Sequence, residues 1–199
     1  MTLRIVAGKH RGRRLEGPKD RRIRPTALRV REAIFDWLAH RRPSQEGDPF
    51  PAGERVLDAF AGSGAMGFEA LSRGAAFVTF LETDAKAVAI LQKNAASLGE
   101  EARVAILRRD ARRPGHLSAP VGLAILDPPY GQDLGGPSLA ALRREGWLRQ
   151  GAVVVLETGA RELCLLPEGF RLLDERRYGE AKALFLGHEM AETPVQAPY

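Results

Sequence analysis

Residues 56–70 read VLDAFAGSGAMGFEA, an apolar run that contains Asp58 and leads into a glycine-rich turn. Gly62, Gly64 and Gly67 have the spacing G-x-G-x-x-G. Glycines at this spacing let the backbone turn tightly and approach a ligand closely, and the following helix offers free N–H groups at its N-terminus. The stretch therefore predicts a strand, a ligand-binding loop and a helix, although a tight turn without a ligand has the same spacing.

The chain on both sides of this stretch repeats the alternation of strand and helix. Five apolar runs are expected to be strands, at residues 55–60, 76–82, 102–107, 122–127 and 151–157. Helical patterns separate most of them, at residues 63–73, 84–98 and 137–149. Strands that are apolar at nearly every position, with helices between them, are typical of a parallel sheet covered on both faces. We therefore predict an α/β fold with a doubly wound, Rossmann-like sheet.

The two ends of the chain depart from this alternation. Residues 169–179 and 181–190 indicate two successive strands joined by a short turn, a hairpin that would add an antiparallel strand at the sheet edge. Residues 3–17 resemble a small hairpin around an Arg-rich turn, and residues 26–40 have the apolar spacing of a helix. The chain is thus expected to carry a small hairpin and helix before its main domain.

Charge is concentrated in the N-terminal region. Residues 1–42 contain 13 Lys and Arg against four acidic residues, whereas the remaining chain has 17 basic and 21 acidic residues. A basic arm on a mildly acidic body is typical of a protein that binds a phosphate backbone at one end, although a solvated surface is the alternative. The candidate phosphate contacts are Lys9, His10, Arg11, Arg13, Arg14, Arg24, Arg29 and Arg31.

Composition limits the class of protein further. The 199 residues are 44% hydrophobic and 28% charged, which suits one soluble globular domain with a small extension. No apolar run approaches the roughly 20 residues of a membrane-spanning helix, and the N-terminus lacks the pattern of a signal peptide. We therefore expect a cytoplasmic protein, with no membrane partner, that is a monomer. Cys164 is the only cysteine and the histidines show no ligand spacing, so we predict no disulfide and no metal site.

The ligand of the glycine loop is suggested by two carboxylates. Glu82 follows Gly62 by 20 residues, at the end of the second expected strand, where a carboxylate can accept ribose hydroxyls. This arrangement also suits a nicotinamide or flavin dinucleotide. Asp58, however, would place negative charge beside the loop, which favours a ligand with a cationic amine or sulfonium over a pyrophosphate. We therefore predict S-adenosylmethionine as the cofactor.

Residues 125–131, ILDPPYG, should follow the fourth strand and emerge beside the glycine loop. Pro128 and Pro129 have fixed φ angles and no N–H, so the Asp127 carboxylate and the Pro128 carbonyl form a rigid pair of acceptors. Such a pair suits an NH₂ group, and Tyr130 offers a face on which a heterocycle can stack. We predict that this corner binds the exocyclic amine of a nucleobase and turns its lone pair toward a methyl donor. A simple strand-ending turn would explain only the prolines.

These motifs resemble the RsmD family of bacterial 16S rRNA guanine-N2 methyltransferases. The resemblance covers nearly the whole chain and is carried by RIVAGKHRGRRL, RPTALRVREAIFDWL, VLDAFAGSGAMGFEALSRGA, FLETDAKAVAILQKN, AILDPPY and RRYGEAKALFLG. It implies a sheet of seven strands with the last antiparallel. It also implies methyl transfer from S-adenosylmethionine to the N2 amine of a guanine, in the small ribosomal subunit or an assembly intermediate of it.

The resemblance also assigns roles to residues. Asp110 would reach the adenine edge of the cofactor, and Glu82 its ribose. The implied cofactor contacts are Asp58, Phe60, Gly62, Ser63, Gly64, Glu82, Thr83, Asp110 and Ala111. The implied catalytic residues are Asp127, Pro128, Pro129 and Tyr130. Residues 1–42 would form an RNA-binding extension, residues 53–190 the methyltransferase domain and residues 191–199 a C-terminal tail.

Two other functions remain open at this point. The DPPY turn is shared with adenine-N6 DNA methyltransferases, so it indicates the chemistry better than the substrate. A non-catalytic RNA-binding factor for ribosome assembly, with a vestigial cofactor pocket, would show the same basic N-terminus. A nicotinamide dehydrogenase is disfavoured because no residue is positioned for hydride transfer. Asn94 could line the cofactor pocket or end a helix.

Overall fold

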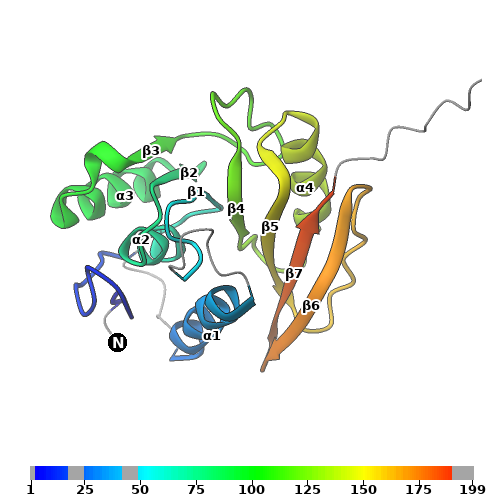
Figure 1. Ribbon diagram of the computed structural model, residues 1–199, viewed down its shortest axis with the longest axis horizontal. Helices are drawn as coiled ribbons and strands as arrows, with labels where there is room; N and C mark the ends of the chain where they lie inside the picture. Colours follow the sequence, from blue (N-terminus) through cyan, green and yellow to red (C-terminus); the bar gives the residue numbers. More distant parts are fainter. Residues whose placement is uncertain (1–2, 18–24, 42–48, 190–199) are drawn as a thin grey trace, which may run out of the picture.

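The computed structural model describes residues 3–17, 25–41 and 49–189, and these form a sheet flanked by helices (Figure 1). The strands are β1 Arg55–Ala59, β2 Phe77–Leu81, β3 Val104–Leu107, β4 Val121–Leu126, β5 Leu148–Gly159, β6 Phe170–Tyr178 and β7 Ala181–His188. The helices are α1 Pro25–Arg41, α2 Ala65–Ser72, α3 Ala85–Leu98 and α4 Gly135–Arg144, with a short 3₁₀ turn at Glu101–Arg103. The predicted tail, residues 191–199, lies outside the described residues.

The sheet has seven strands in the order β3-β2-β1-β4-β5-β7-β6. The first five strands pair in parallel, whereas β7 runs antiparallel to both of its neighbours. The predicted seven-stranded Rossmann-like sheet with an antiparallel last strand is confirmed. The expected position of that strand at the sheet edge is wrong, because β7 lies between β5 and β6. All eight residues of β7 are buried, whereas β6 alternates exposed and half-buried residues, so the more polar strand takes the edge.

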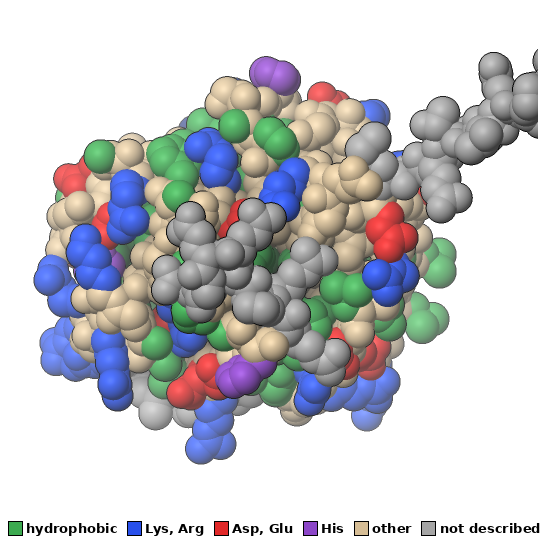
Figure 2. Space-filling view, in the orientation of Figure 1, with side chains coloured by type: hydrophobic (Ala, Val, Ile, Leu, Met, Phe, Trp, Pro, Cys, Tyr) green, Lys and Arg blue, Asp and Glu red, His purple; other side chains and the backbone are tan. Residues whose placement is uncertain are grey.

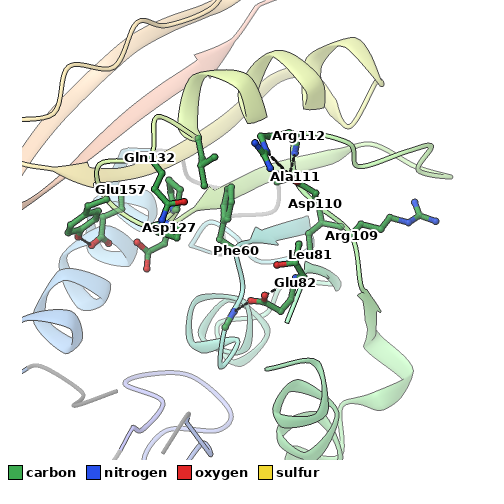
Figure 3. A pocket seen from close by; sticks show the side chains of 16 residues that line it. Phe60, Leu81, Glu82, Arg109, Asp110, Ala111, Arg112, Asp127, Gln132 and Glu157 are labelled. Carbon is green, nitrogen blue, oxygen red and sulfur yellow. Dashed lines mark hydrogen bonds and ion pairs between the residues drawn. The ribbon is translucent and has the colours of Figure 1, made fainter. Parts of the chain in front are cut away.

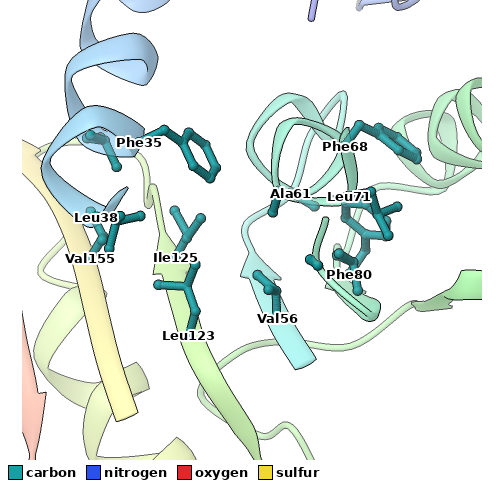
Figure 4. Packing of buried hydrophobic residues seen from close by; sticks show 14 of the residues in the cluster. Phe35, Leu38, Val56, Ala61, Phe68, Leu71, Phe80, Leu123, Ile125 and Val155 are labelled. Atoms are coloured by element: carbon teal, nitrogen blue, oxygen red, sulfur yellow. The ribbon is translucent and has the colours of Figure 1, made fainter. Parts of the chain in front are cut away.

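Helices cover both faces of the sheet, as the unbroken apolar strands indicate. On one face, α1, α2 and α3 enclose a core in which Phe35 of α1 lies near Ile125 of β4 and Phe68 of α2 near Phe80 of β2 (Figure 4). On the other face, α4 packs against β1, β4 and β5 around the fully buried Trp147. The central strands are therefore buried on both sides, and only their ends can contribute to a site.

Helix α4 ends earlier than the sequence pattern predicts. The apolar spacing suggested a helix over residues 137–149, but α4 ends at Arg144 and β5 begins at Leu148. Gly146 takes a φ of 71°, and the N–H of Trp147 bonds the carbonyl of Leu142, which closes the helix end. The apolar residues after this turn continue the pattern by coincidence and belong to a strand.

The N-terminal segment, residues 3–17, packs against α2 and α3. It forms a single antiparallel bridge between Arg4 and Arg14 in place of the two short strands that were expected. Its turn contacts α2 so closely that a Cβ on Gly8 would lie 1.8 Å from the Ser72 carbonyl oxygen, and the φ of Gly8 is +80°. A side chain at this position would therefore displace the segment from the helix.

Candidate active site

A cavity of about 700 Å³ opens at the carboxyl ends of the parallel strands (Figure 3). Loops that follow β1, β2, β3, β4 and β5 supply its walls, which is where ligands bind in open α/β sheets. Ten residues singled out by the sequence line it, namely Phe60, Gly62, Glu82, Thr83, Asp110, Ala111, Asp127, Pro128, Pro129 and Tyr130. The structure thus brings the glycine loop and the DPPY corner into one cavity.

Glu82 is held rigidly at the cavity wall by backbone groups. Its Oε2 accepts the N–H of Gly62 at 2.8 Å, and its Oε1 accepts those of Thr83 at 2.7 Å and Asp84 at 2.9 Å. A carboxylate offers about four lone-pair sites, so these bonds leave room for a hydroxyl of a bound ligand. The glycine loop therefore orients the carboxylate that the sequence assigned to the ribose.

Three predicted cofactor contacts lie behind the cavity wall and not on it. Asp58 is 3% exposed, and its Oδ2 accepts the N–H of Gly67 at 2.8 Å. A Cβ on Gly64 would meet Leu91 and Phe68, so this glycine serves the packing of α2 and α3. The carbonyl of Ser63 accepts a hydrogen bond from the Asn94 side chain at 3.0 Å. The expectation that these residues face the ligand is therefore corrected, because helix packing occupies them.

The burial of Asp58 also changes its charge state. Burial raises the pKa of Asp58 well above its ordinary range, and the carboxylates of Asp127 and Glu82 raise it further, against the hydrogen bond from Gly67. A carboxyl group in this setting shapes the loop from below. It does not supply the surface charge beside the ligand on which the sequence argument relied.

Asp110 lies on the opposite wall with a partner of its own. The Arg112 guanidinium contacts its Oδ2 at 2.6 Å, and this hydrogen bond lowers the pKa of Asp110. The backbone N–H of Arg112 bonds Oδ1 at 2.8 Å. Arg109 and Arg112, which sequence reasoning missed, therefore line the cavity together with Asp110. Their spacing in RRDARR, directly after β3, was the available signal.

The DPPY corner closes the other end of the cavity. Tyr130 is 46% exposed, and its hydroxyl donates to Oε1 of Glu157 at 2.6 Å. Burial raises the pKa of Glu157, against this hydrogen bond. Glu162 braces the same corner by accepting the N–H of Gly131 at 3.1 Å and that of Gly159 at 3.0 Å. The corner is thus fixed from β5 and the turn after it.

Sequence reasoning missed Glu157, although a signal for it was present. Glu157 follows the apolar run of β5 as Glu82 follows that of β2. Because the carboxyl ends of parallel strands meet at one edge, an acid that follows an apolar strand is a candidate for the site. The same reasoning was applied to Glu82 and Asp127 only.

Two of the predicted phosphate contacts are buried and serve the fold. His10 is 6% exposed, with Nε2 at 2.5 Å from Oε1 of Glu100. Arg31 is 4% exposed, donates to the carbonyl of Arg4 and lies 3.6 Å from Glu69. The expectation that these two side chains meet a phosphate is therefore corrected, because buried carboxylates pair with both.

The other basic residues of this region are exposed. Lys and Arg side chains gather on the side of the molecule where the N-terminal segment and α3 lie (Figure 2). The exposed candidates are Lys9, Arg11, Arg13, Arg14 and Arg29. Lys9 also contacts Glu100 at 3.2 Å, and Arg13 donates to the carbonyl of Ser97 at 2.5 Å. Arg24 lies outside the described residues.

Asn94 takes neither of the roles that the sequence left open. It is 1% exposed, its Oδ1 accepts the N–H of Glu16 at 2.8 Å, and its Nδ2 donates to the carbonyls of Glu16 and Ser63, both at 3.0 Å. The helix that carries it, α3, ends at Gly99 instead. Asn94 thus joins the end of the N-terminal segment to the glycine loop.

The fold and the cavity together define a class. A seven-stranded sheet with β7 antiparallel, a glycine loop after β1, a carboxylate after β2 and a DPPY corner after β4 are the features of a Rossmann-like methyltransferase. In the part of the chain that the structure describes, no helix is long and apolar enough to cross a membrane. The described residues also contain no group of three or more His, Cys, Asp or Glu side chains that could hold a metal ion.

Comparison with known proteins identifies the family. The profile of the family described as conserved hypothetical protein 95 matches residues 3–187. Ribosomal RNA small subunit methyltransferase D of Haemophilus influenzae is 36% identical over 186 residues, which cover 89% of each chain. The enzyme of the same name from Escherichia coli K12 is 34% identical over 180 residues, 89% of this chain and 86% of that one. The chain belongs to this family, the RsmD family, and is a methyltransferase.

Solved structures agree with the assignment. An Escherichia coli protein, yhhF, named as a candidate methyltransferase, superimposes with a TM-score of 0.80 at 30% identity, covering 96% of this chain and all of that one. A hypothetical protein of Thermus thermophilus gives a TM-score of 0.71 at 30% identity, covering 94% of this chain and 99% of that one. The fold and family imply S-adenosylmethionine as the methyl donor.

Proposed function

We propose that this enzyme transfers a methyl group from S-adenosylmethionine to the exocyclic N2 amine of a guanine in 16S rRNA, at position 966. The observation that carries the proposal is the shared cavity, in which Asp127 and Tyr130 face the same space as Gly62 and Glu82. A methyl donor held by the glycine loop and a base held by the DPPY corner would therefore meet within one enclosed volume.

The residues of the cavity fit the cofactor. Glu82, fixed by backbone N–H groups, would accept ribose hydroxyls, and Gly62 leaves the wall open beside it. Phe60, Thr83 and Ala111 would contact the nucleoside part. When bound, the cofactor supplies an electrophilic methyl group on a sulfonium. The carboxylate of Asp110 is bound to Arg112, so its predicted contact with the adenine edge requires Asp110 to share its oxygens with that arginine.

Asp127 and Pro128 would act on the amine of the target base. The lone pair of an exocyclic amine is delocalised into the ring, which makes the amine a poor nucleophile. The Asp127 carboxylate and the Pro128 carbonyl would accept its two hydrogens and turn the lone pair toward the methyl group. As the C–N bond forms, the nitrogen becomes cationic, and the nearby carboxylate stabilises that charge and accepts the proton that the nitrogen then loses.

Tyr130 would hold the plane of the base. Base stacking on an aromatic ring contributes about 1–3 kcal/mol, and the ring of Tyr130 is 46% exposed at the cavity. Because its hydroxyl is bound to Glu157, the ring has a fixed orientation before the base arrives. The target guanine has to leave its stack to reach this position.

The substrate class is supported by the relatives and by charge. The Haemophilus influenzae and Escherichia coli relatives are named for the small subunit RNA. In this chain, the exposed Arg11, Arg14 and Arg29 would bind phosphates of 16S rRNA, in the small subunit or its assembly intermediate, with residues 1–42 as the extension that holds the RNA. The enzyme would act as a monomer in the cytoplasm.

The substrate is tested by supplying labelled S-adenosylmethionine with three acceptors in parallel. These are small subunits that lack the modification, free 16S rRNA and duplex DNA. The proposal predicts label in N2-methylguanine from subunits or rRNA, read by nucleoside analysis. Label in DNA adenine alone would contradict it. Absence of transfer together with absence of S-adenosylhomocysteine binding by calorimetry would favour a non-catalytic assembly factor.

A further inference from the structure

Glu157 lies where the target base would be recognised. Leu126 of β4 pairs with Leu156 of β5, so Asp127 and Glu157, the residues that follow this pair, emerge side by side from adjacent strands. Both line the cavity, and their carboxylates lie close to one another at the end formed by the DPPY corner (Figure 3). Tyr130 occupies one oxygen of Glu157, and a carboxylate retains acceptor capacity after one such bond.

We propose that Glu157 selects guanine by accepting a hydrogen bond from its N1–H while Asp127 and Pro128 hold the N2 amine. The proposal rests on the proposed function, since it names the residue that reads the base in the same site. N1–H and the N2 amine are adjacent donors on one edge of guanine. Two neighbouring carboxylates, one from β4 and one from β5, present acceptors to both of them.

The chemistry of the purines explains why this contact would discriminate. Adenine carries a lone pair at N1, which a carboxylate repels, and it has no amine at C2. Burial strengthens such discrimination, because an unpaired polar group in a desolvated site costs the full desolvation of that group. Burial also raises the pKa of Glu157, so a donor from the base stabilises the charged form that the cavity disfavours.

A second interpretation gives Glu157 only the task of holding the Tyr130 hydroxyl. The two interpretations differ in which base the variants accept. A brace for Tyr130 affects every base that stacks on the ring, whereas a residue that reads N1 affects guanine and an N1-lone-pair analogue in opposite directions. Base analogues in the RNA therefore separate the two roles.

The experiment uses the full chain, with Glu157→Gln as the test variant. RNA acceptors carry guanine, 2-aminopurine or 2,6-diaminopurine at the target position. Both analogues keep the N2 amine and replace N1–H by a lone pair, and they differ from each other at C6. Tyr130→Phe removes the hydroxyl that Glu157 binds, and Glu162→Gln changes a neighbouring acid that braces backbone N–H groups. S-adenosylhomocysteine affinity verifies that each variant is folded.

We expect the wild-type enzyme to favour guanine over either analogue by about 100-fold in kcat/KM. In Glu157→Gln, the amide oxygen can still accept the Tyr130 hydroxyl while its NH₂ group donates to the N1 lone pair. The preference for guanine should therefore fall to about tenfold or less with both analogues. Tyr130→Phe and Glu162→Gln should change kcat/KM for all three bases by similar factors.

The results distinguish a failure of this inference from a failure of the proposed function. If wild-type enzyme forms N2-methylguanine and Glu157→Gln keeps the wild-type preference among the bases, the role of Glu157 in reading N1 is overturned and the proposed function stands. If wild-type enzyme forms no N2-methylguanine on subunits or rRNA, the proposed function itself fails, and this inference fails with it.

Discussion

The cavity and the N-terminal segment both depend on acidic residues, but the two regions use them in opposite ways. At the cavity, Glu82 and Glu157 are fixed at the wall and keep lone pairs directed to a ligand. Under the N-terminal segment, Glu69 is fully buried and Glu100 is 2% exposed. These two carboxylates bind backbone N–H groups and basic side chains of the protein itself.

This difference separates recognition from docking. Glu69 accepts the N–H groups of Val6 at 2.8 Å and Ala7 at 3.0 Å, and Arg73 contacts it at 2.8 Å. Some basic residues of the N-terminal region thus neutralise buried acids, and only the remainder can meet RNA. The segment is built into the domain through α2 and α3, so its outward arginines hold a fixed position relative to the cavity.

The largest effect on stability is expected at Glu69. Glu69→Ala leaves the buried Arg31 and two backbone N–H groups without their acceptor, so the free energy of unfolding should fall by roughly 3–5 kcal/mol. Glu101→Ala, at an exposed acid, serves as the control and should cost no more than about 0.5 kcal/mol. Denaturant unfolding measures both. Equal costs would show that the buried acid does not dock the segment.

Glu100 should give a smaller effect that depends on pH. The hydrogen bond from Arg103, with those from His10 and Lys9, lowers the pKa of Glu100 to about 2. A carboxylate with a lowered pKa stabilises the fold above its unfolded pKa, near 4.5 in the absence of partners, and loses that contribution as pH falls toward 2. Glu100→Gln should therefore cost roughly 2–3 kcal/mol at pH 7.

Unfolding curves at several pH values test this expectation. The difference between wild type and Glu100→Gln should be constant above about pH 5 and shrink progressively below it. A difference that stays the same down to about pH 2.5 would contradict the assignment of the charge to this network.

Asn94 tests the link between the two regions. Asn94→Ala removes hydrogen bonds to the backbone of Glu16 and Ser63, so we expect a loss of about 2 kcal/mol in stability and a severalfold weaker S-adenosylhomocysteine affinity. Asn94→Asp keeps the acceptor for the Glu16 N–H but loses both donated bonds, and should weaken cofactor affinity comparably. Unchanged affinity in both folded variants would mean that the glycine loop does not depend on this contact.

The smallest effect on stability is expected at the outward arginines. Arg11 and Arg14 are exposed, so replacing both by Gln should change the free energy of unfolding by no more than about 0.5 kcal/mol. RNA affinity should fall about tenfold, and its salt slope should decrease by roughly 1.4–1.8 if each contacts one phosphate. Arg176 and Arg177, on the edge strand β6, are the matched control pair. An equal loss of affinity in the control pair would assign RNA binding to net charge alone.

The cavity was more predictable from sequence than the N-terminal segment, for a physical reason. Parallel strands deliver their carboxyl ends to one edge, so Glu82, Asp127 and the glycine loop could be brought together from their order along the chain. Glu157 could have been included by the same rule. Asp58 could not be resolved in this way, because whether an acid at the end of a strand faces the cavity or the helix behind it depends on the turn that follows.

The N-terminal segment was less predictable because its partners are distant in sequence. The arginine spacing indicates a basic surface but does not state which side chains point outward. Arg31 pairs with Glu69, and His10 with Glu100, 90 residues away. Each of these acids lies on or beside a helix and has no local feature that marks it as buried. Helix boundaries, such as the early end of α4, were set by turn geometry at Gly146 and not by apolar spacing.

The most direct test of the catalytic account is the rate of methyl transfer by Asp127→Asn at saturating S-adenosylmethionine and RNA, with S-adenosylhomocysteine affinity measured on the same preparation. The account predicts a fall in kcat of roughly 100- to 1,000-fold with cofactor affinity unchanged within about threefold, because the carboxylate acts on the amine and not on the cofactor. A variant that keeps more than about a tenth of the wild-type kcat, or that loses cofactor affinity in proportion to its rate, would contradict it.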